Sequence, residues 1–159
     1  MTWSSFVDRR PSRLDMLMEM ASVVAKRSTC NRLHVGAVLA KDGRILSMGY
    51  NGPVSGAPHC KHIVDSKPRN TTLSDHVSQG CQDSVHAEAN ALIFAAREGI
   101  SVKGAQLYVT HQPCLNCAQL IINSGITTIT YDQPYRLDDG LNLLKLHNVR
   151  CLPYERQDS

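Results

Sequence analysis

Aromatic residues are scarce in this 159-residue sequence, where phenylalanine, tryptophan and tyrosine together make up only 5%. Charge is modest too, with 19% charged residues and a formal net charge of +3. Proteins that hold nucleic-acid strands usually combine a dense basic surface with aromatic stacking platforms. We therefore expect a small anionic substrate as the partner of this chain, and no nucleic-acid polymer.

Long apolar runs are also absent. No stretch approaches the roughly 18 consecutive apolar residues that a membrane-spanning helix needs. Residues 1–13 carry charged and aromatic side chains where a secretory signal would have its apolar centre. We expect a cytoplasmic protein without membrane contact. Its hydrophobic content of 42% is enough for one core, so the sequence predicts a single domain over residues 1–159.

Apolar periodicity predicts an alternation of helices and strands. The expected helices cover 12–26, 86–98, 114–124 and about 137–147, and the expected strands cover 35–40, 44–50, 106–110, 127–131 and 149–152. Asp42-Gly43 lies between the first two strands and favours a tight hairpin. This order predicts an α/β fold, in which helices cover a mixed sheet.

A long irregular segment, residues 51–85, interrupts this pattern. It is rich in glycine, proline, serine and asparagine, and it contains histidines and cysteines that are potential metal ligands. Loops of this length inside a domain are uncommon and tend to be functional. The alternative is a disordered insertion.

Two predicted helix starts carry residues suited to metal chemistry. The first reads His86-Ala87-Glu88 and the second reads Pro113-Cys114-Leu115-Asn116-Cys117. Helix N-termini favour thiolates, and one histidine with two cysteines is a ligand count typical of catalytic zinc, which keeps its fourth position open for water. Glu88 follows the histidine by two residues, so we expect it beside that open position, where it can accept a proton. Taken alone, the Cys-x-x-Cys pair is as typical of a structural zinc knuckle or a redox pair.

Further motifs accompany these two. They are Arg27-Ser28-Thr29-Cys30, Val35-Gly36-Ala37-Val38, Gly49-Tyr50-Asn51-Gly52, His59-Cys60, Val85-His86-Ala87-Glu88-Ala89-Asn90-Ala91 and Leu107-Tyr108-Val109-Thr110. With them, the sequence resembles the cytidine and deoxycytidylate deaminase superfamily, and within it the deoxycytidylate deaminases, from about residue 14 to 153. The resemblance implies a three-layer α/β/α fold with a mixed five-stranded sheet. It also implies Zn²⁺-dependent hydrolysis of dCMP to dUMP and ammonia, which supplies thymidylate synthesis, with Glu88 as the proton carrier.

The resemblance also implies substrate contacts. It places Asn51 on the deoxyribose side of the nucleotide, with Tyr135 and Ala87 as further contacts. The alternative for Asn51 is a turn residue in Tyr-Asn-Gly, and for Tyr135 it is packing at the sheet edge. A nucleotide phosphate needs cations, for which the candidates are Arg27 and Arg32, with His111 a weaker one. Ordinary surface arginines are the alternative.

A second, structural zinc is implied by the same resemblance. The matching positions are Cys30, Cys60 and His76, with Cys81 as the fourth ligand, because the more direct match at Ser84 would bind metal poorly. His59 and His62 are substitutes, and buried cysteines without a metal are the alternative. Such an ion would clip the loop 51–85 to the first helix.

Other functions remain open. One alternative is a related zinc deaminase that acts on another nucleotide or on tRNA adenosine, and another is a zinc-stapled interaction module that has no catalysis. The resemblance further implies a homohexamer regulated by dCTP and dTTP.

Overall fold

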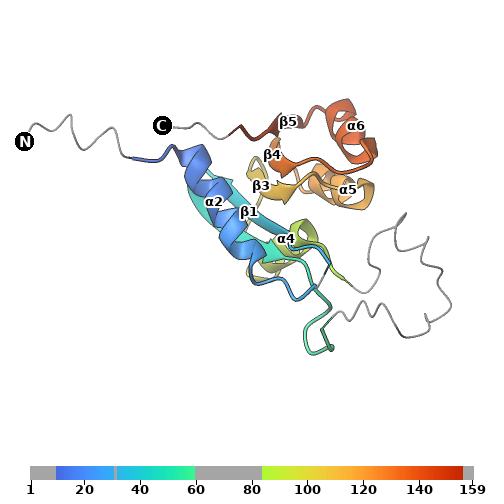
Figure 1. Ribbon diagram of the computed structural model, residues 1–159. Helices are drawn as coiled ribbons and strands as arrows, with labels where there is room; N and C mark the ends of the chain where they lie inside the picture. Colours follow the sequence, from blue (N-terminus) through green and yellow to red (C-terminus); the bar gives the residue numbers. More distant parts are fainter. Residues whose placement is uncertain (1–9, 31, 60–83, 156–159) are drawn as a thin grey trace, which may run out of the picture.

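The computed structural model describes residues 10–30, 32–59 and 84–155 (Figure 1). Helix α2, Arg13–Ala25, is the first element of this part of the chain. It begins after Ser12, whose hydroxyl accepts a hydrogen bond from the Asp15 backbone N–H at 3.0 Å. This bond satisfies one of the donors that a helix N-terminus leaves unpaired, so Ser12 is the N-cap of α2.

Five strands form one sheet in the order β2-β1-β3-β4-β5. Their bounds are Gly36–Lys41 for β1, Arg44–Tyr50 for β2, Gln106–His111 for β3, Thr128–Gln133 for β4 and Arg150–Pro153 for β5. Strand β1 runs antiparallel to β2 and β3, whereas β3, β4 and β5 are parallel to one another. The predicted mixed sheet is thus confirmed, and so is the hairpin, because Asp42 and Gly43 both have positive φ, at 53° and 74°.

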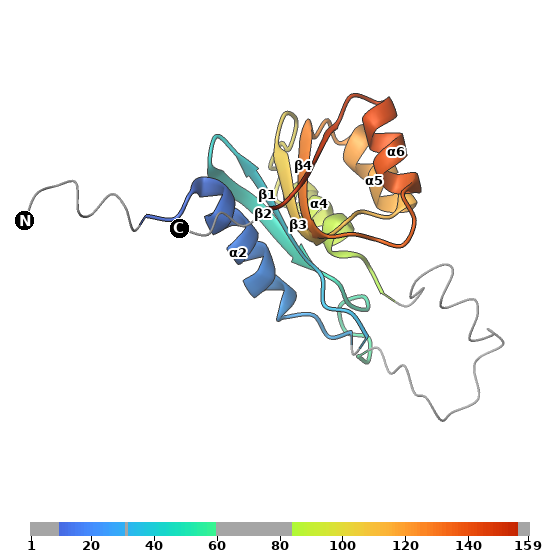
Figure 2. The ribbon, with the colours of Figure 1, turned by 45° about the horizontal axis from the view of Figure 1, so that its top comes forward.

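The sheet lies between two layers of helices (Figure 2). Helix α2 covers one face, and the other face carries α4 (Ala87–Arg97), α5 (Leu115–Asn123) and α6 (Asp139–Leu146). Alternate residues of β1 serve the two faces, since Val38 packs with α2 while Ala37 and Leu39 pack with the opposite helices. This is the three-layer α/β/α architecture that the sequence resemblance implied.

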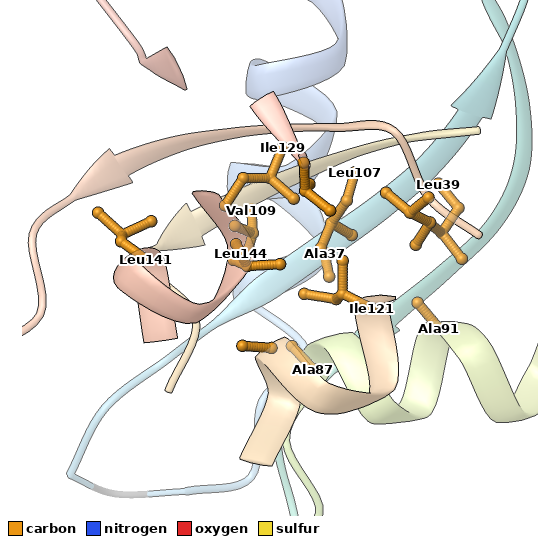
Figure 3. Close-up of a cluster of buried hydrophobic side chains, with 13 residues drawn as sticks. Ala37, Leu39, Ala87, Ala91, Leu107, Val109, Ile121, Ile129, Leu141 and Leu144 are labelled. Atoms are coloured by element: carbon orange, nitrogen blue, oxygen red, sulfur yellow. The ribbon is translucent and has the colours of Figure 1, made fainter. Parts of the chain in front are cut away.

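The larger core, on the face opposite α2, joins the sheet to the three later helices (Figure 3). Leu107 and Ile129 of the sheet meet Ile121 of α5 and Leu144 of α6, and each is at most 1% exposed. Burial of such a side chain contributes roughly 1.5 to 3 kcal/mol. At Gly49 of β2 a Cβ would lie 2.4 Å from the Ala87 carbonyl oxygen, so α4 begins directly against the sheet.

Element ends differ from the predictions by one or two residues. Helix α6 begins two residues later than expected, because Leu137 and Asp138 face the Gln112 amide, which donates hydrogen bonds to both.

The ends of the segment 51–85 are joined by a bridge, in which Gly52 and Val85 exchange two backbone hydrogen bonds. Among the described residues, no helix is both long enough and apolar enough to cross a bilayer.

Candidate active site

The structure brings together the three metal donors singled out in the sequence. Nδ1 of His86 lies 3.4 Å from Sγ of Cys114 and 3.3 Å from Sγ of Cys117. All three ligand atoms lie within 4.8 Å of one another. Tetrahedral zinc, with Zn–S near 2.3 Å and Zn–N near 2.0 Å, separates a sulfur and a nitrogen ligand by roughly 3.6 Å. The donor set therefore fits a zinc ion.

Two helix N-termini position these donors. His86 is the N-cap of α4 and Cys114 is the N-cap of α5, and neither side chain makes a capping hydrogen bond to its own helix. Both side chains turn toward each other instead, and Cys117 joins them from the first turn of α5. The positive ends of two helix dipoles favour negative charge at this place.

The two thiols ionise unequally. A hydrogen bond from Cys117, assisted by one from His86, lowers the pKa of Cys114 to about 4. The neighbouring Cys114 sulfur and burial raise the pKa of Cys117. The hydrogen bond to Cys114 raises the pKa of His86, against the effect of burial. One thiolate therefore forms readily while the second proton is retained, and a bound dication would displace it because metal ligands must be deprotonated.

Glu88 is the buried carboxyl of the site. It belongs to the first turn of α4 and is 4% exposed. Burial is the main cause that raises the pKa of its carboxyl above the ordinary value for glutamate. A carboxyl whose pKa lies closer to neutrality can both accept and return a proton during a reaction.

A cavity of about 340 Å³ opens beside the donors, and His86, Glu88 and Cys114 line it. This volume lies in the range of small-molecule sites, roughly 300 to 1,000 Å³. Several predicted substrate contacts also line it, namely Arg32, Asn51, Ala87 and Tyr135. Arg27 is exposed and is not among the lining residues, so the structure separates two arginines that the sequence could not rank.

Asn51 has a structural task as well as a place in the cavity wall. Its Oδ1 accepts a hydrogen bond from the Val35 N–H at 2.8 Å, and its Nδ2 donates to the Leu33 carbonyl at 2.8 Å. The amide thereby holds the chain before β1. Each polar atom keeps capacity for one more hydrogen bond, which a ligand in the cavity can use.

His111 also lines the cavity, at the end of β3. Burial lowers the pKa of its imidazole, with a smaller opposing effect from the Asp132 carboxylate. A histidine with a lowered pKa is neutral at neutral pH, so His111 is a poorer partner for a phosphate than an arginine.

Sequence reasoning missed two polar residues of the cavity wall. Gln112 follows β3, and Arg136 lies with its guanidinium 5.6 Å from the centre of the Tyr135 ring. A cation next to a candidate substrate tyrosine was a usable signal for Arg136. Nothing local marked Gln112, because its partners lie 23 to 26 residues further along the chain.

The second metal site falls mostly outside the described residues. This applies to Cys60, His62, His76 and Cys81. Cys30 is buried and lines the cavity, whereas His59 is exposed. Ser84 also lines the cavity, and its hydroxyl donates to the Val85 carbonyl at 3.4 Å. The second zinc stays a prediction.

The comparisons with known proteins agree with this geometry. The family model of the cytidine and deoxycytidylate deaminase zinc-binding region matches residues 11–133. The deoxycytidylate deaminase of Mycobacterium phage D29 is 41% identical over 127 residues, which are 77% of this chain and 95% of that protein. ComE operon protein 2 of Bacillus subtilis is 38% identical over 119 residues, or 75% of this chain, and the match spans only 58% of its own length.

A solved structure is also similar to this chain in its three-dimensional fold. The dCMP deaminase from the cyanophage S-TIM5, in complex with dCMP and dUMP, superimposes with a TM-score of 0.77 at 30% identity. The match covers 91% of this chain and 98% of that one. Sheet, helices and chain order are therefore shared over nearly the whole length.

Proposed function

We propose that this chain, which belongs to the cytidine and deoxycytidylate deaminase family, hydrolyses dCMP to dUMP and ammonia and so supplies thymidylate synthesis. The observation that carries the proposal is the meeting of His86, Cys114 and Cys117 with the buried Glu88 in one cavity. The similar phage proteins named for deoxycytidylate deamination support the choice of dCMP.

The His86 imidazole and the thiolates of Cys114 and Cys117 would hold Zn²⁺, which would supply the Lewis acidity that makes water a nucleophile at neutral pH. Glu88 accepts a proton from this water and gives it to N3 of the cytosine ring. A C–O bond forms at C4. Glu88 then carries the second water proton to the departing amino group, the C4–N bond breaks, and ammonia leaves. The sum is dCMP plus water to dUMP plus ammonia, without oxidation or reduction.

Burial of Glu88 suits this task. A buried carboxylate exchanges few protons with bulk solvent, and its raised pKa makes it a stronger base toward water. Glu88→Gln keeps the shape of the side chain but removes the proton carrier. We expect kcat to fall by about 10²- to 10⁴-fold while zinc content is retained. Glu98→Gln, on an exposed residue at the other end of α4, is the matched control.

The phosphate of the substrate is met by Arg32 and Arg136 in this proposal, because both arginines line the cavity. Arg32→Ala and Arg136→Ala should each raise KM for dCMP by about 10-fold or more, since a hydrogen bond to a charged group contributes roughly 1.5 to 3 kcal/mol. Neither should change the turnover of deoxycytidine, which has no phosphate. Arg27→Ala, on an arginine outside the cavity lining, should change neither.

The decisive experiment is ammonia release from the purified zinc-loaded protein. dCMP, dCTP, cytidine and a tRNA anticodon stem are offered in parallel, and turnover of dCMP at the highest kcat/KM is the expected outcome. Preference for another nucleotide or for tRNA would identify a related deaminase with a different substrate. Zinc binding without any turnover would identify an interaction module. Either result overturns the proposal.

The second, structural zinc is part of the proposal and has its own measurement. Cys30 is buried beside the cavity, where a thiolate can serve as a ligand together with Cys60, His76 and Cys81. We expect about two zinc ions per chain, and about one in Cys30→Ser. Cys151→Ser is the control and should keep both. One zinc per wild-type chain would contradict this site.

Assembly and regulation follow from the family resemblance alone. We propose a homohexamer that is regulated by dCTP and dTTP. Light scattering of the zinc-loaded protein tests the first, and dCMP turnover with each nucleotide added tests the second. A monomer, or rates that ignore both nucleotides, would remove these properties without affecting the reaction itself.

A further inference from the structure

Gln112 connects the metal-donor segment to a loop on the other side of the cavity. It lies between the end of β3 and Pro113, two residues before Cys114, and is 4% exposed. Its own backbone N–H donates to the carbonyl of Gln133, the last residue of β4, at 2.8 Å. The residue is therefore fixed by the ends of two neighbouring parallel strands.

The side-chain amide of Gln112 makes three hydrogen bonds to the loop 134–138. Oε1 accepts from the Tyr135 backbone N–H at 3.2 Å, while Nε2 donates to the Leu137 carbonyl at 3.0 Å and to Oδ1 of Asp138 at 3.2 Å. Only this orientation of the amide matches one donor and two acceptors, so its two ends are not interchangeable. A single buried side chain thus contacts the loop at three of its residues.

This loop carries two residues of the cavity wall. Tyr135 and Arg136 both line the cavity, and the Arg136 guanidinium lies 5.6 Å from the Tyr135 ring centre. The start of α6, just after the loop, packs against the same donor segment, because a Cβ at Gly140 would lie 2.3 Å from the Pro113 carbonyl oxygen. The position of the loop is therefore tied to the backbone that carries Cys114.

We propose that Gln112 is a positioning residue, which holds Tyr135 and Arg136 at a fixed distance from the metal donors and thereby sets the affinity for substrate. The role of the loop as a substrate wall rests on the proposed function. Gln112 carries no charge and makes hydrogen bonds with the loop, not with Glu88 or the metal donors. Its removal should loosen the loop and leave the proton-transfer groups in place.

The test uses the zinc-loaded protein and begins without any substrate. Gln112→Ala should accelerate amide hydrogen exchange of residues 135–138, because the Tyr135 N–H loses its acceptor. Zinc per chain should stay unchanged. With dCMP, KM should rise by about 10-fold with kcat within about threefold, the change expected when a few hydrogen bonds of modest net strength are lost. Gln133→Ala changes an exposed neighbouring residue whose side-chain amide donates to the Asp132 carboxylate, and it should leave all three measurements unchanged.

A double-mutant cycle separates positioning from simple packing. Gln112→Glu keeps the shape and the acceptor for Tyr135, but it sets a carboxylate against the Asp138 carboxylate. Asp138→Asn in the same chain restores a donor opposite that carboxylate. We expect Gln112→Glu to raise KM and to speed exchange, and the double variant to recover at least half of both effects, because contacting residues show coupling energies that independent sites lack.

Unchanged exchange in Gln112→Ala would overturn the proposal, and so would loss of zinc, a fall in kcat at constant KM, or a double variant no better than Gln112→Glu. A failure of the proposed function looks different. If the wild-type protein does not deaminate dCMP, the exchange measurement still decides whether Gln112 anchors the loop, and KM is then measured on whichever substrate the protein turns over.

Discussion

Helix α2 and the pair α4 and α5 begin in opposite ways. At the start of α2 the Ser12 side chain bonds its own helix, through the Asp15 backbone N–H at 3.0 Å and the Asp15 carboxylate at 2.6 Å. At the starts of α4 and α5, His86 and Cys114 make no capping hydrogen bond. A good N-cap contributes roughly 0.5 to 2 kcal/mol. Helices α4 and α5 lack this contribution, because the His86 and Cys114 side chains point toward each other as metal donors and do not cap their own helices.

The difference shows which parts of this fold contribute stability and which parts contribute the chemistry. The α2 layer supports the sheet by packing and capping, whereas the first turns of α4 and α5 expose backbone dipoles and donors to one small volume. A helix start that lacks its preferred cap, next to another of the same kind, is thus a sign of function. The following five changes break or sharpen this contrast.

The largest effect is expected from loss of a donor at α4. His86→Ala removes the only imidazole of the donor set, so the zinc ion loses one of its three protein ligands. We expect the zinc content to fall by about one ion per chain and ammonia release to fall to the uncatalysed background. Atomic emission and a dCMP assay measure the two. His147→Ala, at an exposed histidine after α6, is the control, and full zinc occupancy in His86→Ala would contradict the assignment.

A smaller effect is expected at Gly140, where α6 meets the start of α5. An added Cβ would lie 2.3 Å from the Pro113 carbonyl oxygen and 2.9 Å from the Cys114 carbonyl carbon. Gly140→Ala should therefore displace the Cys114 donor and weaken zinc affinity by about 10-fold, as changes in the surroundings of metal ligands commonly do. Competition with a chelator measures it. Asn142→Ala, exposed on the same helix, should leave the affinity unchanged.

Gly36 provides the corresponding change on the α2 side. A Cβ there would lie 2.0 Å from the Ala21 carbonyl oxygen, so Gly36→Ala should force α2 away from β1. Overpacking of this kind costs about 1 to 3 kcal/mol of folding free energy. Stability should fall while zinc affinity per folded molecule is kept. A loss of zinc affinity in Gly36→Ala as large as that in Gly140→Ala would contradict the contrast between the two layers.

The cap of α2 should matter for stability alone. Ser12→Ala removes the acceptor of the Asp15 N–H and should cost about 1 kcal/mol. For a chain of this size that lowers Tm by about 2 to 4 °C. Calorimetry measures the shift, and kcat/KM for dCMP should not change. Ser12→Thr keeps the capping hydroxyl and should restore most of the Tm. An activity loss in Ser12→Ala would show that the cap serves the site.

The smallest effect concerns His111. Burial lowers the pKa of its imidazole in the folded protein below the unfolded value, so its contribution to stability is present above the unfolded pKa and is lost as pH falls through the folded pKa. His111→Gln cannot titrate. Between about pH 7.5 and 5.5 the variant should lose less Tm than the wild type, since an unfolded histidine titrates near 6.5. Equal losses of Tm in His111→Gln and the wild type would contradict the prediction.

Local signals made much of the fold predictable. The Ser12 cap, the Asp42-Gly43 hairpin and the helix ends at Gly99 and Gly125 depend on residues a few positions apart. The start of α6 was misplaced because its neighbour Gln112 lies 25 residues earlier in the chain. Patterns within one segment carry no information about such a partner.

The candidate site divides in the same way. The sequence singled out the donor residues and Glu88, because their types and spacing are tied to zinc chemistry. It could not choose between Arg27 and Arg32, and it did not find Gln112 or Arg136. Those answers depend on which side chains reach the cavity, and the structure places Arg32, Gln112 and Arg136 in its lining.

By itself, the amino-acid sequence determined the helices and strands to within one or two residues and the chemical nature of the donors. Tertiary structure alone decided that α4 and α5 begin at one point, and that the loop 134–138 closes one wall of the cavity. The physical reason is the distance along the chain over which each kind of interaction acts. Caps, turns and periodicity act within a few residues, whereas the convergence follows from the order of strands in the sheet and from packing between elements far apart in the chain.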